Sequence, residues 1–141
     1  MTWLAYAVVT SMALAAADLC VKLASGKISN SFGILIYGAC AFLTGLVWVL
    51  WERLRGVHQF AQPDGILSAI GVGIAFAAVT TGLYATFGAG APISIASPVI
   101  RLAGLLVASA AGILIFHEAI SWRYALGAAL TLTGIYFILT R

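Results

Sequence analysis

Two charged residues, Asp18 and Arg101, lie inside long apolar stretches of this 141-residue chain. A charge within a bilayer is costly and usually faces the interior of a helix bundle, where it pairs with another group or lines an ion or substrate path. Lys22 is one helical turn from Asp18 and is a second candidate partner. These side chains could hold a structural ion pair, bind a charged solute, or do both.

The two charges are expected at the same depth. Asp18 lies about 4.5 residues past the middle of its apolar run, or ~7 Å from the mid-membrane plane at 1.5 Å per residue. Arg101 lies about 3.5 residues before the middle of an antiparallel run, or ~5 Å from that plane on the same side. We therefore predict that Asp18 and Arg101 form a coupled pair.

Hydroxyl-bearing residues accompany these charges. At 100° per residue, Ser11, Asp18 and Lys22 share about one third of the helix circumference. The third apolar run offers Thr80, Thr81 and Tyr84, and the fourth has a stripe of polar and small residues that includes Ser97. One interpretation is a substrate or ion pathway lined by Asp18, Arg101, Lys22, Ser11, Ser97, Thr81 and Tyr84. The other is a structural Asp–Arg clasp with ordinary small-residue packing.

The elements that must position these residues are membrane-spanning helices. A spanning helix needs about 20 mostly apolar residues, and such runs cover residues 3–24, 32–51, 65–88, 93–116 and 122–140. The runs are continuous rather than alternating, which excludes a β-barrel. We predict an all-α integral membrane fold, with one five-helix domain over residues 1–141. Turns are expected at residues 25–27, 63–65 and 88–92, with Ser121 capping the last helix.

The composition excludes several functions. The chain is 63% hydrophobic and only 8% charged, whereas soluble domains carry about 25% charged residues. A net charge of +3 is too small for a nucleic-acid interface. Cys20 and Cys40 lie in apolar runs outside any CxxC or Cys/His pattern, and there is no phosphate loop or nucleophile elbow. We therefore expect no metal, no cofactor and no enzymatic activity.

The basic residues are divided evenly between the two sides of the predicted membrane. An odd number of spans places the termini on opposite sides. The side of the N-terminus holds Arg53, Arg55 and Arg123, and the other side holds Lys22, Lys27 and Arg141. The positive-inside rule then gives almost no bias, so the chain is compatible with insertion in both orientations.

The last two runs resemble a known family. Pro98 lies early in the fourth run, Glu118 follows its end, and Gly127 with Gly134 form a Gly-x6-Gly in the fifth run, while Lys22 lies near the end of the first. This pattern resembles the EamA domain of the drug/metabolite transporter superfamily, which has a Pro early in the fourth helix, a Glu at its end and a Gly-x6-Gly in the fifth helix. The resemblance covers nearly the whole chain, including the five-helix count.

The resemblance implies a function. Full-length members contain two five-helix domains in inverted orientation, so this chain resembles the half-size members, which must pair. It would then be one inverted repeat of a ten-helix exporter or exchanger of small organic metabolites in the cell membrane. Its partner would be an antiparallel second copy or a paired homologous subunit.

The fifth helix also resembles the dimer-forming last helix of the small multidrug pumps, which implies dimer contacts through Gly127, Thr131 and Gly134. Those pumps use a glutamate eight residues before a lysine, but here that position is Leu14, and Asp18 lies one turn away. This departure argues against proton-coupled export of cationic drugs. The alternatives are an accessory or assembly membrane protein without a transport path, and a subunit of a lipid-linked sugar flippase.

Overall fold

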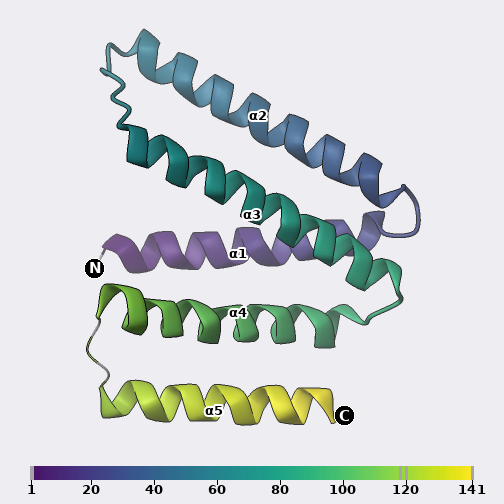
Figure 1. The fold of residues 1–141 in the computed structure, drawn as a ribbon. Coiled ribbons are helices and arrows are strands. Elements are labelled where there is room, and N and C mark those ends of the chain that lie inside the picture. The colour runs from purple at the N-terminus through teal and green to yellow at the C-terminus, as the bar shows by residue number, and fades with distance from the viewer. Residues whose placement is uncertain (1, 118, 120, 141) are drawn as a thin grey trace. The chain divides into compact units, whose positions relative to one another are not determined.

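The computed structural model describes residues 2–117, 119 and 121–140, and most of them belong to five long helices (Figure 1). The helices are α1 (Thr2–Ala24), α2 (Asn30–Leu54), α3 (Pro63–Gly88), α4 (Ile93–Phe116) and α5 (Trp122–Leu139). All five are long and apolar enough to cross a membrane. The predicted all-helical architecture with five long apolar helices is confirmed for the described residues, and helices of this length and composition indicate a multi-pass membrane protein.

The helix ends show how local chemistry sets the boundaries. Gly26 ends α1 in the left-handed region with φ 79°, and the Ser121 side chain accepts a hydrogen bond from the Tyr124 N–H at 3.1 Å to cap α5. Both ends were predicted. The turn predicted at residues 63–65 is wrong, because Pro63 begins α3. Proline suits the first helical turn, where its missing N–H would have no helical acceptor.

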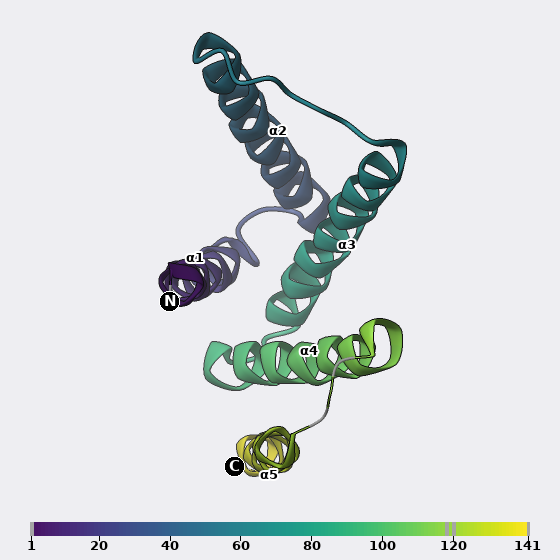
Figure 2. The same cartoon turned by 90° about the vertical axis from the view of Figure 1, so that its left-hand side faces the viewer.

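The chain divides into two compact units, Met1–Ala89 and Gly90–Arg141. In the first unit, α3 contacts both α1 and α2. Figure 2 shows α2 and α3 close together near the start of α2 and separating towards the loop of residues 55–62. The single-domain organisation of residues 1–141 stays a prediction.

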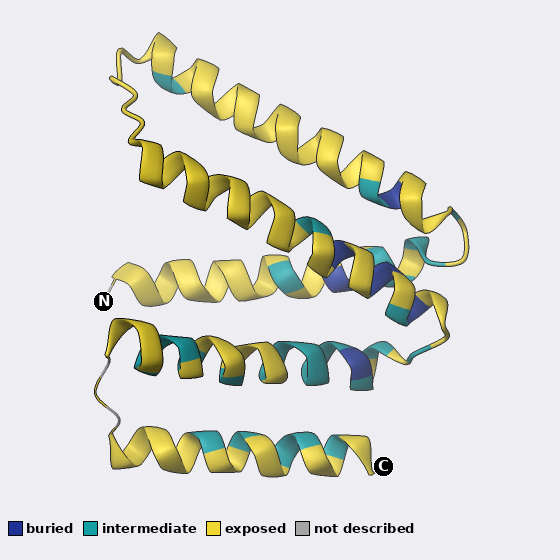
Figure 3. Cartoon of the chain, in the orientation of Figure 1, coloured by how far each residue is buried: buried dark blue, intermediate teal, exposed yellow. Residues whose placement is uncertain are grey.

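Burial within the first unit is concentrated where its three helices meet. The buried residues there, which we call the three-helix junction, are Asp18, Gly33, Thr80, Leu83, Tyr84 and Phe87 (Figure 3). Residues 35–79 include no buried position. The part of α2 and α3 nearer the 55–62 loop therefore has almost no protein packed around it within the described chain.

The second unit is a helical hairpin in which α4 contacts α5. The α4 helix continues through Pro98 and ends at His117, whose left-handed φ of 52° allows its N–H to donate to the Gly112 carbonyl. Most of α5 is exposed. Its half-buried residues recur at helical spacing on one face: Ala128, Thr131, Gly134, Ile135 and Ile138.

Candidate functional site

The α1 helix places Asp18 and Lys22 on one face, one turn apart. Asp18 is only 1% exposed, although it belongs to an otherwise apolar helix. Burying a carboxylate is unfavourable unless other groups compensate it, and Asp18 does have an interaction partner. A charged side chain that is buried in spite of this energetic penalty indicates either a functional role or a specific structural pair.

Lys22 is held against α3. Its Nζ atom lies 5.6 Å from the centroid of the Phe87 ring, and Phe87 is 2% exposed. This distance is within the range of a cation–π interaction, in which the ring face attracts the ammonium group. The contact joins the last turn of α1 to the last turn of α3 and positions the lysine at the edge of the three-helix junction.

The α3 helix contributes one face to the three-helix junction. This face is formed by buried residues spaced one, three or four positions apart: Thr80, Leu83, Tyr84 and Phe87. The Thr80 hydroxyl donates to the Phe76 carbonyl at 2.9 Å, so its oxygen can still accept a second hydrogen bond. Thr81, by contrast, is exposed and donates to the Ala77 carbonyl at 2.8 Å. The structure thus places Thr80 in the junction, whereas the expected pathway included Thr81.

The α2 helix contributes a glycine that the sequence did not point to. A Cβ atom built on Gly33 would lie 2.5 Å from Tyr84 Cζ and 2.8 Å from the Tyr84 hydroxyl oxygen. Only a residue without a side chain leaves room for this ring. Gly33 therefore sets the position of the Tyr84 hydroxyl, and no local sequence signal links two residues so far apart along the chain.

A pocket of about 350 Å³ opens between the three helices. It is lined by Ala17, Cys20, Val21, Ala24, Ile28, Gly33, Ile36, Tyr37, Thr80 and Tyr84. Most of this lining is aliphatic, and the Thr80 and Tyr84 hydroxyls add hydrogen-bonding groups. Asp18 lies on the adjacent face of α1, about 100° around the helix from Ala17. The junction thus places an apolar pocket with hydroxyl groups next to a buried carboxylate.

The junction gathers groups that can bind a small solute. Within the described part of the chain, no group of three or more His, Cys, Asp or Glu residues could hold a metal ion. Cys20 and Cys40 are free thiols, and Cys20 lines the pocket. A carboxylate, an ammonium group, hydroxyls and an apolar surface suit a small solute with polar and apolar parts.

The other predicted site residues lie elsewhere. Ser11 is exposed on α1, and its hydroxyl donates to the Val8 carbonyl at 2.8 Å. Ser97 and Arg101 are half-buried on α4 in the second unit, and both have interaction partners. The coupling of Arg101 to Asp18 stays a prediction.

The residues expected at a dimer contact lie on α5. Gly127 is exposed, whereas Thr131 and Gly134 are half-buried. Of the residues that carry the EamA resemblance, Glu118 lies outside the described residues. Pro98 is half-buried within α4.

These features define a class of protein: an α-helical, multi-pass membrane protein with a buried acidic residue beside a pocket. No family model, curated protein or solved structure matches this chain.

Proposed function

We propose that this protein is a membrane transporter, an exporter or exchanger of small organic metabolites. The observation that supports the proposal best is Asp18, which is 1% exposed in an apolar spanning helix next to a pocket of about 350 Å³. Ionisable residues inside spanning helices are rare, and they mark ion and substrate pathways. The lining of the pocket is suited to binding rather than to bond-breaking chemistry.

Each part of the junction has a role in this proposal. The aliphatic lining takes the apolar part of the solute, and the hydroxyls of Thr80 and Tyr84 orient its polar part. Asp18 binds a cationic group of the solute or a coupling ion. Lys22, held over Phe87, supplies the opposite charge near the end of α1.

The working unit in this proposal is a dimer. The resemblance to half-size EamA proteins supports one five-helix repeat per chain, and alternating access needs two inverted repeats that rock around a central site. A second, antiparallel copy or a paired homologous subunit would complete ten helices. Gly127, Thr131 and Gly134 on α5 are small residues of the kind that allow close helix contact.

Transport is tested in vesicles that contain the purified protein. Uptake and counterflow of a panel of small metabolites are measured with and without a proton gradient. We expect flux of at least one class, and we expect Asp18→Asn to reduce it to the level of protein-free vesicles. The matched control is Asp64→Asn, an exposed carboxylate in the first turn of α3, which should keep wild-type flux. If the wild-type protein moves no solute, the accessory or assembly role is favoured.

The antiparallel dimer is tested by adding lysines that fix the orientation in which the chain inserts into the membrane. Two lysines added to the 55–62 loop should place that loop inside in every copy, and this variant alone should lose activity. A second variant with lysines near Gly90 should restore activity when both are co-expressed. Full activity from a uniformly oriented population would contradict the antiparallel dimer.

A further inference from the structure

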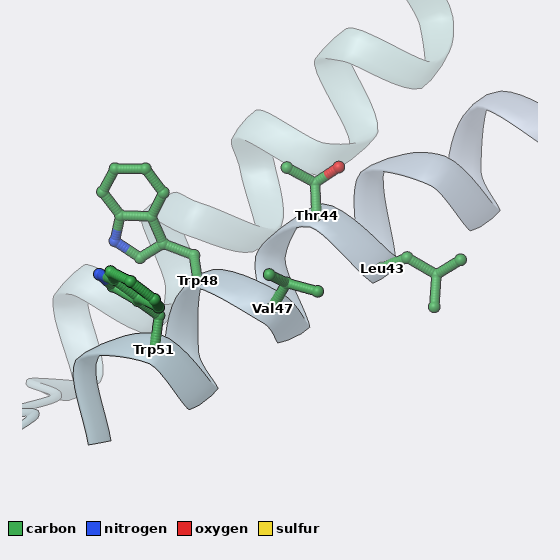
Figure 4. Close-up of a pocket in the computed structure, with 5 residues that line it drawn as sticks. All are labelled: Leu43, Thr44, Val47, Trp48 and Trp51. Atoms are coloured by element: carbon green, nitrogen blue, oxygen red, sulfur yellow. The ribbon is translucent and has the colours of Figure 1, made fainter. Parts of the chain in front are cut away.

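A second hollow lies on α2, well away from the three-helix junction. It has a volume of about 510 Å³ and is lined by Leu43, Thr44, Val47, Trp48 and Trp51, all on this one helix. Figure 4 shows the two indole rings at one end of this row of side chains and Leu43 at the other. We call this surface the α2 groove. Its walls are apolar and its residues are exposed, so it opens towards whatever surrounds the helix.

Two contacts organise the end of the groove where the indole rings lie. The Arg55 guanidinium carbon lies 4.5 Å from the centroid of the Trp51 ring, within cation–π range. The Trp48 indole N–H donates to Glu52 Oε1 at 2.8 Å. The first contact keeps a cation at the mouth of the groove, and a guanidinium stacked on a ring still directs its N–H donors outward in its own plane. The second contact holds the Glu52 carboxylate in a hydrogen bond with the Trp48 indole.

The dimensions match one leaflet of a bilayer. Leu43 and Trp51 are eight residues apart, which is about 12 Å along a helix, and one leaflet of the hydrocarbon core is about 15 Å thick. Arg55 is a further ~6 Å along the chain direction. Tryptophan rings favour the level of the lipid headgroups, and arginine reaches the phosphates just beyond them. A groove of this length, with tryptophans and an arginine at one end, matches the distance from the acyl-chain region to the lipid phosphates.

We propose that the α2 groove is a binding site for an anionic phospholipid. One acyl chain lies along Leu43, Val47 and the indole rings, and the phosphate is bound by Arg55, with Arg53 adding positive charge. An anionic lipid is favoured because this end of α2 has two arginines, Arg53 and Arg55, against one glutamate, Glu52, which leaves an excess of positive charge. A zwitterionic lipid brings its own cation and gains less from the excess positive charge. This inference does not depend on the proposed transport function.

The test uses quenching of tryptophan fluorescence by brominated acyl chains. The protein is placed in phosphatidylcholine vesicles that contain a minor fraction of phosphatidylglycerol. Bromine is carried either by the phosphatidylglycerol or by an equal amount of the phosphatidylcholine. In the variant Trp3→Phe/Trp122→Phe, the remaining tryptophans are Trp48 and Trp51. Its fluorescence therefore reports from the groove. We expect the anionic lipid to occupy the groove about five times more often than its abundance predicts, the preference that one arginine near the surface supplies.

Three controls make the result decisive. Arg55→Gln should remove the preference, whereas Arg123→Gln, beside Trp122 on α5, should leave it intact. The variant Trp48→Phe/Trp51→Phe, which reports from Trp3 and Trp122, should show no preference. Equal quenching by both lipids at the groove would overturn the proposal, as would an anionic preference that survives Arg55→Gln. The same preference at Trp3 and Trp122 would also overturn it, because it would indicate general attraction rather than a site.

Discussion

The two ends of α3 differ sharply, although both are apolar. Near its C-terminus, Phe87 is 2% exposed and packs where α1 and α2 approach α3; eleven residues earlier, at the middle of the helix, Phe76 is already 50% exposed, and Leu67 near the N-terminus is 74% exposed. The half of α2 nearer the 55–62 loop is equally open, with Val47 at 65% exposure. The same residue type therefore serves as a packing contact at the junction and as exposed surface eleven residues away.

The packed end and the open end of this unit therefore have different features. The packed end holds the buried carboxylate, the pocket and the close contact of Gly33 with Tyr84. The open end presents apolar side chains and the α2 groove to its surroundings. Lipid solvates apolar side chains as well as protein does, so helix contacts in a membrane depend on close packing and polar interactions rather than on hydrophobic burial. Substitutions should therefore matter at the packed end and be tolerated at the open end.

The largest effect is expected at Asp18. If Asp18 is one member of the predicted charge pair, Asp18→Asn should lower the free energy of unfolding by about 3–5 kcal/mol, the usual cost of removing one partner of a buried pair. The measurement is an SDS titration of the protein in mixed micelles, followed by tryptophan fluorescence. Asp64→Asn, which affects only an exposed helix start, should cost less than about 1 kcal/mol. If the two variants lose the same free energy of unfolding, the buried carboxylate of Asp18 contributes no more to stability than the exposed one of Asp64.

A double-mutant cycle extends this test to the predicted pair. Arg101→Gln and Asp18→Asn are each measured alone and then together by the same titration. If the two side chains are coupled, the double variant loses less stability than the sum of the single losses. Strict additivity would argue against their contact.

The next effect compares the two phenylalanines of α3. Phe87→Ala should lower stability by about 2–3 kcal/mol, somewhat less than in a water-soluble core because lipid accepts the exposed apolar surface. It should also remove the ring that contacts Lys22. Phe76→Ala should change stability by no more than about 0.5 kcal/mol. The contrast fails if Phe76→Ala is as damaging as Phe87→Ala in the SDS titration.

A smaller effect is expected where α2 meets α3. In Gly33→Ala the new Cβ lies 2.5 Å from Tyr84 Cζ, so the ring must move, and we expect a loss of about 1–2 kcal/mol. The control is Gly38→Ala on the same helix, where no atom lies within 4 Å of the new Cβ; it should be neutral or stabilising. Tyr84→Leu shortens the opposing side chain, so adding it to Gly33→Ala should relieve part of the loss. A Gly33→Ala variant as stable as Gly38→Ala would show that the contact is not tight.

The smallest effect compares neighbouring threonines. Thr80→Val removes a hydroxyl that lines the pocket, and Thr81→Val removes an exposed one. Each hydroxyl bonds to its own helix backbone, so neither change should cost more than about 0.6 kcal/mol of stability. Under the transport proposal, Thr80→Val should raise the KM for solute flux and Thr81→Val should not. Equal KM values for the two variants would indicate that the solute does not bind in the pocket.

The sequence by itself determined the elements of this protein. Apolar runs of spanning length predict the helices, because a backbone in lipid must satisfy its own hydrogen bonds. Gly26 and Ser121 mark ends through local backbone chemistry. The 100° periodicity also placed Asp18 and Lys22 on one face of α1, and that face is buried at Asp18. All of these features depend on residues a few positions apart.

Only the tertiary structure decided which residues of different helices meet. Thr80 and Thr81 have the same side chain and nearly the same local sequence, and the rotation of α3 against α1 and α2 alone places Thr80 in the pocket. The contact of Gly33 with Tyr84 likewise depends on how α2 crosses α3. In helices that are apolar all round, hydrophobicity does not specify which face packs inward. The packed face is selected by small steric and polar contacts between distant residues.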